Sequence, residues 1–416
     1  MINQDGLQWD EGTFSLEPKW TRDPSVTDIK TVLQPILQPH DDFDITFVAQ
    51  GAFNKLYKIS CDGHLFAMRI SLPVDPFNKT NSEVATLQYV REGGSLPVPK
   101  VCSHNSSAAN PIGFEWILME YMPGRPLREI WKHITWDAKE ALIQRLAKHC
   151  AAMYENQFDQ IGNHHLLEEG QKSLQPLKLG QLVSIPFLYG DHPVLPIPRG
   201  PFRTSREWLE ARLLFKEADA TKALAKSEDD DEREEAETIL SNIRRLHRHI
   251  DEFFPSDLIE KTMLVHPDLS QSNVLLDANG ELTAVVDWEC VSTVPLWQAC
   301  NYPRLIEGSE RYQKPDENTY AHEENGEINE IYWYHLEDYQ KTQLREFFLE
   351  QMSKLEPGWI QVYQSSQRLR DFDMAVENCD GPFSLEVVSL WLDLIEDGEK
   401  PYKSLERRLR GYTDEP

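Results

Sequence analysis

The chain lacks several features that mark membrane and secreted proteins. None of its apolar runs approaches the length needed to span a bilayer. No basic residue precedes Lys19, whereas Asp5 and Asp10 are acidic, which argues against secretory signals and Arg-rich transit peptides. The 6 cysteines are scattered without metal-ligand spacing, so we expect reduced thiols and no structural zinc. Together these absences predict a cytoplasmic location.

Positive charge is also scarce. The 416 residues include 42 Lys and Arg against 69 Asp and Glu, which gives a net charge of −27. Such a field repels nucleic acid and anionic membrane surfaces, so neither is an expected partner. It would favour a cationic substrate, although a solvated acidic surface is the simpler interpretation. The length exceeds that of a single hydrophobic core, so we expect two lobes, and nothing indicates the oligomeric state.

The first part of the chain predicts an antiparallel sheet with one helix. An Asp-Gly pair at 62–63 separates two alternating apolar segments, which is a strong hairpin signal. The Asn-Ser pair at 81–82 is expected to cap a helix that ends near 93–94. A further strand is expected over 114–120, before a Pro-Gly break.

Helical periodicity dominates the rest of the chain. The predicted fold is therefore α+β, with a small antiparallel β-sheet N-lobe and a larger, mainly helical C-lobe. We expect an N-terminal extension over 1–44, the N-lobe over 45–122 and the C-lobe over 123–416. An acidic insertion near 226–237 is interpreted as a solvated loop or an exposed helix start.

The most informative segment covers residues 264–289. An Asn-Gly pair at 279–280 lies between two apolar runs and predicts a two-residue hairpin turn, which would align Asn273 with Val286. Asp287 follows directly, so its carboxylate and the Asn273 amide would meet at the open end of the hairpin, about 5–8 Å apart between Cβ atoms. Two such oxygen ligands suit Mg²⁺, which fills its remaining positions with phosphate and water.

Asp268 lies in the loop that precedes this hairpin. The spacing His266-x-Asp268-x-x-x-x-Asn273, followed by Asp287, is that of the kinase catalytic loop and its metal-binding aspartate. Asp268 would orient the acceptor hydroxyl and take its proton, while Asn273 and Asp287 hold the metal. His266 is expected to brace the loop rather than to ionise. Isolated aspartates usually cap turns, but the coincidence of loop, hairpin and second aspartate favours the functional interpretation.

With the predicted first lobe, these motifs resemble the aminoglycoside phosphotransferase and choline kinase-like superfamily over roughly residues 45–310. The resemblance implies a two-lobed protein-kinase-like fold, ATP as the phosphate donor with GTP as the alternative, and Mg²⁺. It also implies transfer of the γ-phosphate to a hydroxyl of a small molecule. The acceptor itself is not specified, because specificity in this fold lies in variable helices and loops of the C-lobe.

The resemblance also assigns nucleotide contacts in the N-lobe. A turn with a single glycine resembles the turn that covers the nucleotide, where backbone amides approach phosphate oxygens. Its residues are Gly51, Ala52, Phe53 and Asn54. Ala67 and Arg69 share one face of a strand and resemble the kinase Ala-x-Lys motif, with arginine in place of lysine.

Three further positions complete the expected nucleotide site. Glu83 on the first-lobe helix resembles the partner of the strand cation. Glu120 and Met122 resemble the hinge, whose backbone would contact the adenine edge.

Other interpretations stay open. Arg69 and the glycine-poor turn are compatible with a nucleotide-binding or interaction protein that has lost turnover. A protein kinase is disfavoured because Trp288 and Glu289 follow Asp287 where kinases have Phe-Gly. These two residues, together with the aromatic and acidic stretch 331–338, suggest an amine-binding pocket and hence an amine-bearing acceptor. The simpler interpretation is that the aromatic residues of that stretch pack helices together.

Overall fold

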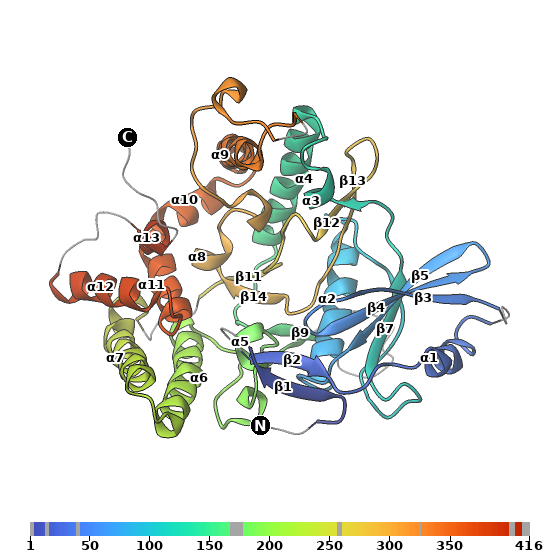
Figure 1. Ribbon diagram of the computed structural model, residues 1–416, viewed down its shortest axis with the longest axis horizontal. Coiled ribbons are helices and arrows are strands. Elements are labelled where there is room, and N and C mark those ends of the chain that lie inside the picture. The colour runs from blue at the N-terminus through green and yellow to red at the C-terminus, as the bar shows by residue number, and fades with distance from the viewer. Residues whose placement is uncertain are drawn as a thin grey trace.

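The computed structural model describes residues 4–12, 16–38, 42–166, 178–255, 260–323, 326–398 and 404–409. The two-lobed α+β fold predicted from the sequence is confirmed (Figure 1). The sheet of the N-lobe lies at one end of the molecule, and the helices of the C-lobe form the other. The outer ends of the predicted extension and C-lobe, at 1–3 and 410–416, lie outside the described residues.

The N-lobe contains a five-stranded antiparallel sheet within residues 44–120, all of which the structure describes. Its strands, in sheet order, are β3 (Asp44–Gln50), β4 (Asn54–Cys61), β5 (His64–Ser71), β7 (Glu115–Glu120) and β6 (Val101–Asn105). The hairpin predicted between β4 and β5 is confirmed, since Cys61 pairs with His64. Asp62 and Gly63 have φ angles of 47° and 76°, as a tight primed turn requires.

Helix α2 (Asn78–Gly93) packs against this sheet and ends at Gly94, where a φ of 64° terminates it as expected. The prediction that the Asn-Ser pair at 81–82 caps the helix is wrong, because the helix begins three residues earlier. The Asn81 side chain accepts a hydrogen bond from the Leu166 backbone N–H at 2.8 Å, and the Ser82 hydroxyl accepts one from Asn163 at 3.0 Å. Polar residues that resemble a cap therefore attach α2 to the C-lobe.

The N-terminal segment also joins the two lobes. It forms the hairpin β1 (Leu7–Glu11) and β2 (Leu16–Trp20), followed by α1 (Val26–Leu33). Leu7 and Trp9 belong to a buried apolar cluster with Phe53 of the N-lobe and Leu188 of the C-lobe. The hairpin thus covers the outer side of the turn that contains Phe53.

The C-lobe is mainly helical. Its longer helices are α4 (Trp136–Glu155), α6 (Ser205–Lys226), α7 (Asp230–Phe253), α9 (Glu330–Leu355), α10 (Pro357–Ser365), α11 (Gln367–Asn378) and α12 (Leu385–Glu396). Shorter elements are α3 (Leu127–Ile130), α5 (Ile185–Leu188), α8 (Leu296–Ala299), α13 (Leu405–Leu409), β9 (Asn163–His165), β10 (Lys178–Gly180), β11 (Thr262–Val265) and β14 (Ser292–Pro295). Helix α4 packs against α9, and α6 packs against α7. Among the described residues, no helix combines the length and apolar character that a bilayer crossing requires.

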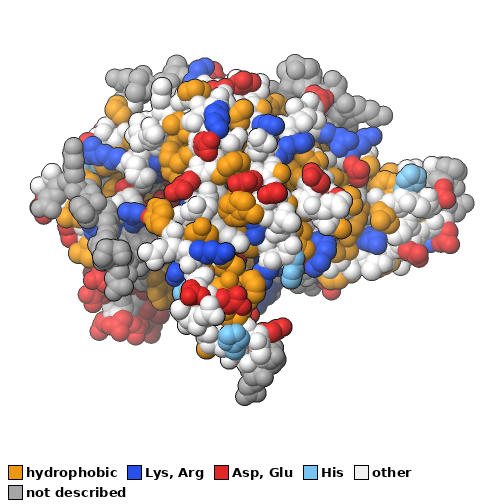
Figure 2. Space-filling view, turned by 90° about the horizontal axis from the view of Figure 1, so that it is seen from above, with side chains coloured by type: hydrophobic (Ala, Val, Ile, Leu, Met, Phe, Trp, Pro, Cys, Tyr) orange, Lys and Arg blue, Asp and Glu red, His pale blue; other side chains and the backbone are white. Residues whose placement is uncertain are grey.

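The acidic run at 228–235 lies at the exposed start of α7. Asp229 accepts hydrogen bonds from the backbone N–H groups of Asp231 and Glu232, at 3.0 and 3.1 Å, and so caps the helix. Acidic side chains in the first turn also interact favourably with the helix dipole. Acidic and basic side chains are interspersed over much of the face shown in Figure 2. This arrangement agrees with a solvated surface charge.

The hairpin of β12 (Val274–Leu276) and β13 (Leu282–Val285) has the predicted register at its open end. The Val286 N–H donates to the Asn273 carbonyl at 2.9 Å, so these two residues are aligned. The predicted two-residue turn is wrong, because the Asp277 carboxylate accepts from the backbone N–H groups at 279 and 281 and stabilises a longer turn. A bulge at Thr283 then restores the register.

The connection between the lobes runs along this hairpin. Strand β8 (Arg125–Pro126) pairs with β12, directly after the chain leaves β7. Gly124 has a φ of 117°, and a Cβ atom there would come within 2.5 Å of the Thr283 hydroxyl oxygen. Only glycine fits this contact. We keep the proposed boundary between the lobes at residues 122 and 123, where β7 gives way to β8.

His164 on β9 is a buried histidine between the lobes. Its ring stacks on Tyr89 of α2 with 4.6 Å between centroids. Neither ring nitrogen has a hydrogen-bond partner within the part of the chain that the structure describes. Burial lowers the pKa of His164 from an ordinary 6.5 to about 4. The folded protein therefore holds this ring neutral at pH values where the unfolded chain protonates it.

We predict that His164→Phe makes the protein less sensitive to acid. The depressed pKa of His164 contributes stability that is present above pH 6.5 and lost as the pH falls toward 4. At pH 5 the loss from one such residue is about 2 kcal/mol. Phenylalanine keeps the ring contact with Tyr89 and cannot take up a proton. Denaturant unfolding of both proteins at pH 7 and pH 5 measures the difference, and an equal loss in both would contradict the prediction.

Candidate active site

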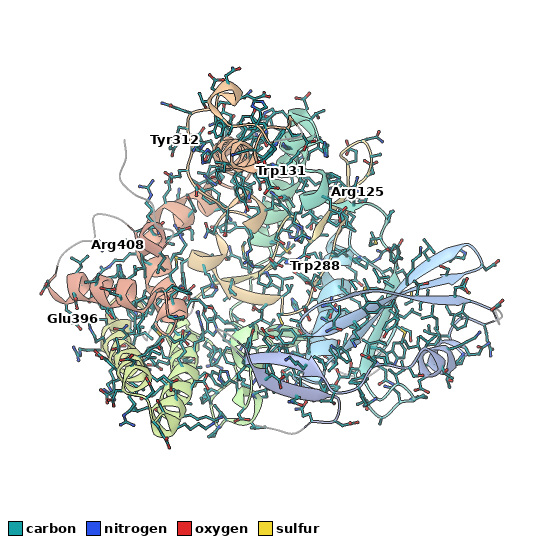
Figure 3. The ribbon with its side chains drawn as sticks, viewed as in Figure 1. Arg125, Trp131, Trp288, Tyr312, Glu396 and Arg408 are labelled. Carbon is teal, nitrogen blue, oxygen red and sulfur yellow. The ribbon has the colours of Figure 1, made fainter. Side chains whose placement is uncertain are left out.

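A cavity of about 660 Å³ lies between the lobes, beneath the sheet of the N-lobe. Apolar side chains from both lobes line part of it, namely Leu56, Ala67, Leu87, Met119 and Leu275. Polar side chains line the rest, namely Asn54, Arg69, Glu83, Asn273, Asp287 and Glu289. A flat apolar group and a charged group could therefore bind side by side. Trp288, which also lines this cavity, lies at the centre of the molecule in Figure 3.

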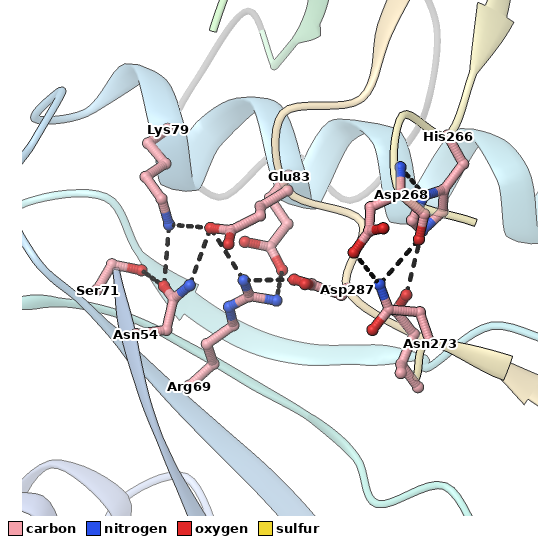
Figure 4. Close-up of polar contacts among 11 residues, drawn as sticks. Asn54, Arg69, Ser71, Lys79, Glu83, His266, Asp268, Asn273 and Asp287 are labelled. Atoms are coloured by element: carbon pink, nitrogen blue, oxygen red, sulfur yellow. Dashed lines mark hydrogen bonds and ion pairs between the residues drawn. The ribbon is translucent and has the colours of Figure 1, made fainter. Parts of the chain in front are cut away.

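The loop between β11 and β12 brings together the three predicted catalytic-loop residues (Figure 4). Asn273 Nδ2 donates to both the carbonyl and the Oδ2 atom of Asp268, each at 2.8 Å. The Asp268 backbone N–H donates to His266 Nδ1 at 3.2 Å, and His266 Nε2 donates to the Val286 carbonyl at 3.1 Å. Burial lowers the pKa of His266. The ring is thus held neutral and joins the loop to the hairpin, as the sequence predicts.

Asp268 also has a cationic neighbour that the sequence did not indicate. Arg304 contacts Asp268 Oδ1 at 3.0 Å, from the segment that follows α8. Both side chains are about half exposed to solvent. The carboxylate is therefore held by Asn273 on one oxygen and by Arg304 on the other.

Arg69 on β5 lies among three carboxylates of the described residues. Its guanidinium contacts Glu83 at 3.0 Å, Asp287 at 2.8 Å and Glu289 at 3.0 Å. Glu83 is not an exposed acid of the first helical turn, since it is 1% exposed and faces Arg69. The expected pairing of the strand cation with the helix acid is present, together with two carboxylates from the segment after β13.

Lys79 is a second site residue that the sequence did not indicate. It lies on α2 one helical turn before Glu83, is 2% exposed, and contacts Glu289 Oε2 at 2.6 Å. Its ammonium also donates to Asn54 Oδ1 at 2.9 Å. A lysine beside an expected helix start is usually solvated, so its burial depends on contacts across the fold. The i, i+4 spacing to Glu83 is the signal that could have indicated it.

These contacts shift the pKa values of the cluster in opposite directions. Burial would lower the pKa of Arg69, but Glu83, Glu289 and Asp287 raise it well above its ordinary value. Burial raises the pKa of Glu83, and Arg69 only partly opposes this. For Glu289 burial acts in the same direction as for Glu83, but Lys79 and Arg69 outweigh it and lower the pKa to about 2. Glu289 is therefore ionised and firmly paired.

The cluster holds one more carboxylate than it holds cations. Arg69 and Lys79 face Glu83, Asp287 and Glu289, and Asp287 is the most exposed of the three acids, at 38% of its side chain. Asp287 and Asn273 both line the cavity, as the hairpin register predicts. The unbalanced, accessible carboxylate beside an amide oxygen fits a hard divalent cation such as Mg²⁺.

The turn predicted to cover a nucleotide connects β3 with β4 beside the cavity. Gly51 and Ala52 are exposed, and a Cβ atom at Gly51 would meet nothing within 4 Å. The Phe53 side chain is instead buried in the apolar cluster with the N-terminal hairpin, so only its backbone is available to a ligand. Glu120 and Met122 line the cavity where the chain leaves β7.

The predicted amine-binding pocket is not formed. Trp288 is buried, donates from its indole N–H to the Val285 carbonyl at 2.9 Å, and lies in the cavity between the lobes with Glu289. In the stretch 331–338, on α9, the Lys132 ammonium lies over the Trp333 ring at 5.1 Å. The chain's own cation thus occupies the aromatic face, and Trp288 and Glu289 line a different cavity from this stretch.

A second cavity, of about 300 Å³, lies on the C-lobe side of the catalytic loop. Pro267 and Arg304, the neighbours of Asp268, contribute to its lining, as do His149 and Tyr302. Asp268 itself lines neither this cavity nor the one between the lobes, although its chain neighbours Pro267 and Leu269 line the smaller one.

The profile of the phosphotransferase enzyme family matches residues 44–298. A subtelomeric hrmA-associated cluster protein of Aspergillus fumigatus is 25% identical over 307 residues, which cover 62% of this chain and 60% of that protein. Altered inheritance of mitochondria protein 9, mitochondrial, of Eremothecium gossypii is 26% identical over 297 residues, covering 59% of this chain and 48% of the relative. The chain thus spans between about half and three fifths of these relatives.

Solved structures of aminoglycoside phosphotransferase APH(4)-Ia are also similar to this chain. One of them is 15% identical to this chain, with a TM-score of 0.44. The match covers 90% of this chain and 98% of the chain in that structure. A thermostable mutant in a ternary complex with ADP and hygromycin B is 16% identical, with a TM-score of 0.44, and covers 89% and 97%.

We predict opposite effects on stability from two substitutions in the charge cluster. Asp287→Asn removes the unbalanced carboxylate and should leave the thermal unfolding midpoint unchanged or raise it, because asparagine tolerates the φ of 66° at this position. Lys79→Met breaks a buried ion pair and should cost about 3–5 kcal/mol. The thermal unfolding midpoints of both variants measure the two effects. Equal destabilisation would show that Asp287 is not the unbalanced carboxylate of the cluster.

Proposed function

Because the chain belongs to the phosphotransferase enzyme family, we propose that it transfers the γ-phosphate of ATP to a hydroxyl group of a small molecule in a Mg²⁺-dependent reaction. The observation that carries this proposal is the convergence of Asp268, Asn273 and Asp287 at the open end of one hairpin, next to the cavity between the lobes. Family membership supports phosphotransfer in general, and the site residues supply the specific roles.

The lining of the cavity would suit the parts of a nucleotide at separate positions. The apolar lining that includes Ala67 suits a base, whose edge would lie along the backbone of Glu120 and Met122. The phosphates would lie beneath the turn of residues 51–54, whose backbone N–H groups suit an anion. Arg69 lines the same cavity, so its guanidinium would place positive charge beside a phosphate. GTP stays the alternative donor.

Asn273 and Asp287 would hold the metal. Asn273 turns its Nδ2 atom to Asp268, which leaves its Oδ1 atom as the oxygen available for coordination. Among the described residues, no cluster of three or more His, Cys, Asp or Glu side chains could hold a metal. That agrees with Mg²⁺, which binds through one or two protein oxygens together with substrate phosphates. When bound, it neutralises charge on the transferring phosphoryl group.

Asp268 would act as the general base. Asn273 holds its Oδ2 atom and Arg304 its Oδ1 atom, so the carboxylate has a fixed orientation. An acceptor hydroxyl that reaches this carboxylate would be oriented by it and would lose its proton to it as phosphoryl transfer proceeds. The cavity that reaches Pro267 and Arg304 is the approach we propose for the acceptor.

The class of acceptor remains open in this proposal. An amine-bearing acceptor stays a hypothesis, but its recognition would use residues other than Trp288 and Glu289, which line the nucleotide cavity. The predicted cytoplasmic location also stays a proposal, since the name of one relative includes the word mitochondrial.

A nucleotide-binding protein without turnover is the second candidate. The observation that favours it is the Arg69 guanidinium, which three carboxylates already engage. A screen of hydroxylated amines and sugars with Mg²⁺ and ATP separates the two candidates. Phosphorylation of any acceptor supports the enzyme. Nucleotide binding that is accompanied neither by a phosphorylated product nor by slow hydrolysis of ATP supports the alternative.

We predict that Asp268→Asn lowers the turnover number at least about 10²-fold, because a positioned general base accelerates a reaction about 10²–10⁴-fold. Nucleotide affinity should change little, since Asp268 does not line the nucleotide cavity. Steady-state kinetics and equilibrium nucleotide binding measure the two effects separately.

The matched control is Glu281→Gln, which neutralises an exposed acid in the turn of the same hairpin. It should leave both quantities unchanged. Retention of more than a tenth of wild-type turnover by Asp268→Asn would rule out the base assignment.

A further inference from the structure

The buried Lys79–Glu289 pair has no role in the scheme above. We propose that Lys79 and Glu289 are positioning residues for the metal site, and that they act through Arg69 to hold Asp287 in place for Mg²⁺. This inference rests on the proposed function, because it assigns Asp287 to the metal. It adds two residues that are not predicted from the kinase pattern of one strand cation and one helix acid.

The Arg69 guanidinium links Glu289 to Asp287. One terminal nitrogen contacts Glu83 at 3.0 Å, and the other contacts both Asp287 at 2.8 Å and Glu289 at 3.0 Å (Figure 4). A planar fork can bridge carboxylates that lie in different directions, whereas an ammonium is a single point of charge. The arginine at this position is therefore explained by the additional carboxylate of Glu289.

Lys79 holds Glu289 from outside the cavity. Its ammonium is buried, contacts Glu289 Oε2 at 2.6 Å, and is not part of the cavity lining. It can therefore affect a ligand only through the residues it holds. By sharing Glu289 with Arg69, Lys79 neutralises a carboxylate that would otherwise compete with Asp287 for the guanidinium.

Asn54 extends the same network to the turn over the cavity. Its amide donates to Glu289 Oε2 at 2.9 Å, and its oxygen accepts from Lys79 at 2.9 Å and from the Ser71 hydroxyl at 2.9 Å. Asn54 is the last residue of the turn predicted to cover the phosphates. The network thus joins that turn to the segment that carries Asp287, so one set of contacts positions both sides of the phosphate site.

The test removes the pair without leaving a buried charge. In Lys79→Met/Glu289→Gln both charges disappear together, so folding should persist. We expect the Mg²⁺ concentration that half-saturates nucleotide binding to rise about 10–100-fold, as is typical when contacts behind a metal ligand are lost. A purely structural pair would change the unfolding midpoint and leave this Mg²⁺ requirement unchanged.

The matched control is another buried ion pair, between Arg212 of α6 and Asp373 of α11 in the C-lobe; Arg212 also contacts Glu377, whose side chain is 56% exposed. Arg212→Met/Asp373→Asn should lower the unfolding midpoint without changing the Mg²⁺ requirement. A Lys79→Met/Glu289→Gln protein that folds and keeps the wild-type Mg²⁺ requirement would overturn the inference while leaving the proposed function intact.

Arg69→Lys provides a second test that does not depend on the folding of the double variant. Since lysine cannot bridge the three carboxylates, the Mg²⁺ requirement should again rise about 10–100-fold. An unchanged requirement would overturn the inference. If the wild-type protein binds no nucleotide in the presence of Mg²⁺, both the inference and the proposed function fail.

Discussion

The Arg69 guanidinium is the interaction on which the site depends. It connects three segments that are far apart in the sequence, namely strand β5, helix α2 and the residues after β13, through Glu83, Asp287 and Glu289. A cation alone in this position would be costly to bury, and the acids alone would repel one another. Each part therefore requires the others. In the proposed function, the extra carboxylate would leave Asp287 available to Mg²⁺.

The arrangement also requires the lobes to keep a fixed relation. Helix α2 carries Lys79 and Glu83, and its Asn81 and Ser82 side chains are hydrogen-bonded to the C-lobe around β9. A buried ion pair between Asp75 of the N-lobe and Arg199 of the C-lobe adds a second connection between the lobes. The N-terminal hairpin contributes apolar contacts to both lobes. Contacts that resemble ordinary packing thus keep the two halves of the charge cluster together.

The sequence predicts the hairpin of β12 and β13 well and the charge cluster only in part. Alternating apolar residues align Asn273 correctly because the register depends on local pattern, and the bulge at Thr283 offsets the error in the turn. The predicted start of α2 was wrong because the polar pair at 81–82 has the composition of a helix cap but forms hydrogen bonds with the C-lobe. Lys79 was missed because its burial beside Glu83 is a property of the folded chain, not of the local sequence.

If one carboxylate of the cluster is unbalanced, the site should bind a metal and a nucleotide together and neither of them alone. Calorimetric titration of the wild-type protein with Mg²⁺ alone, with a non-hydrolysable ATP analogue alone, and with both tests it most directly. Neither ligand alone should bind tightly, because Asn273 and Asp287 give the metal too few oxygens and the free triphosphate meets excess negative charge. Together they should bind tightly. Equally tight binding of the analogue in EDTA would show that the unbalanced carboxylate does not require a metal for nucleotide binding.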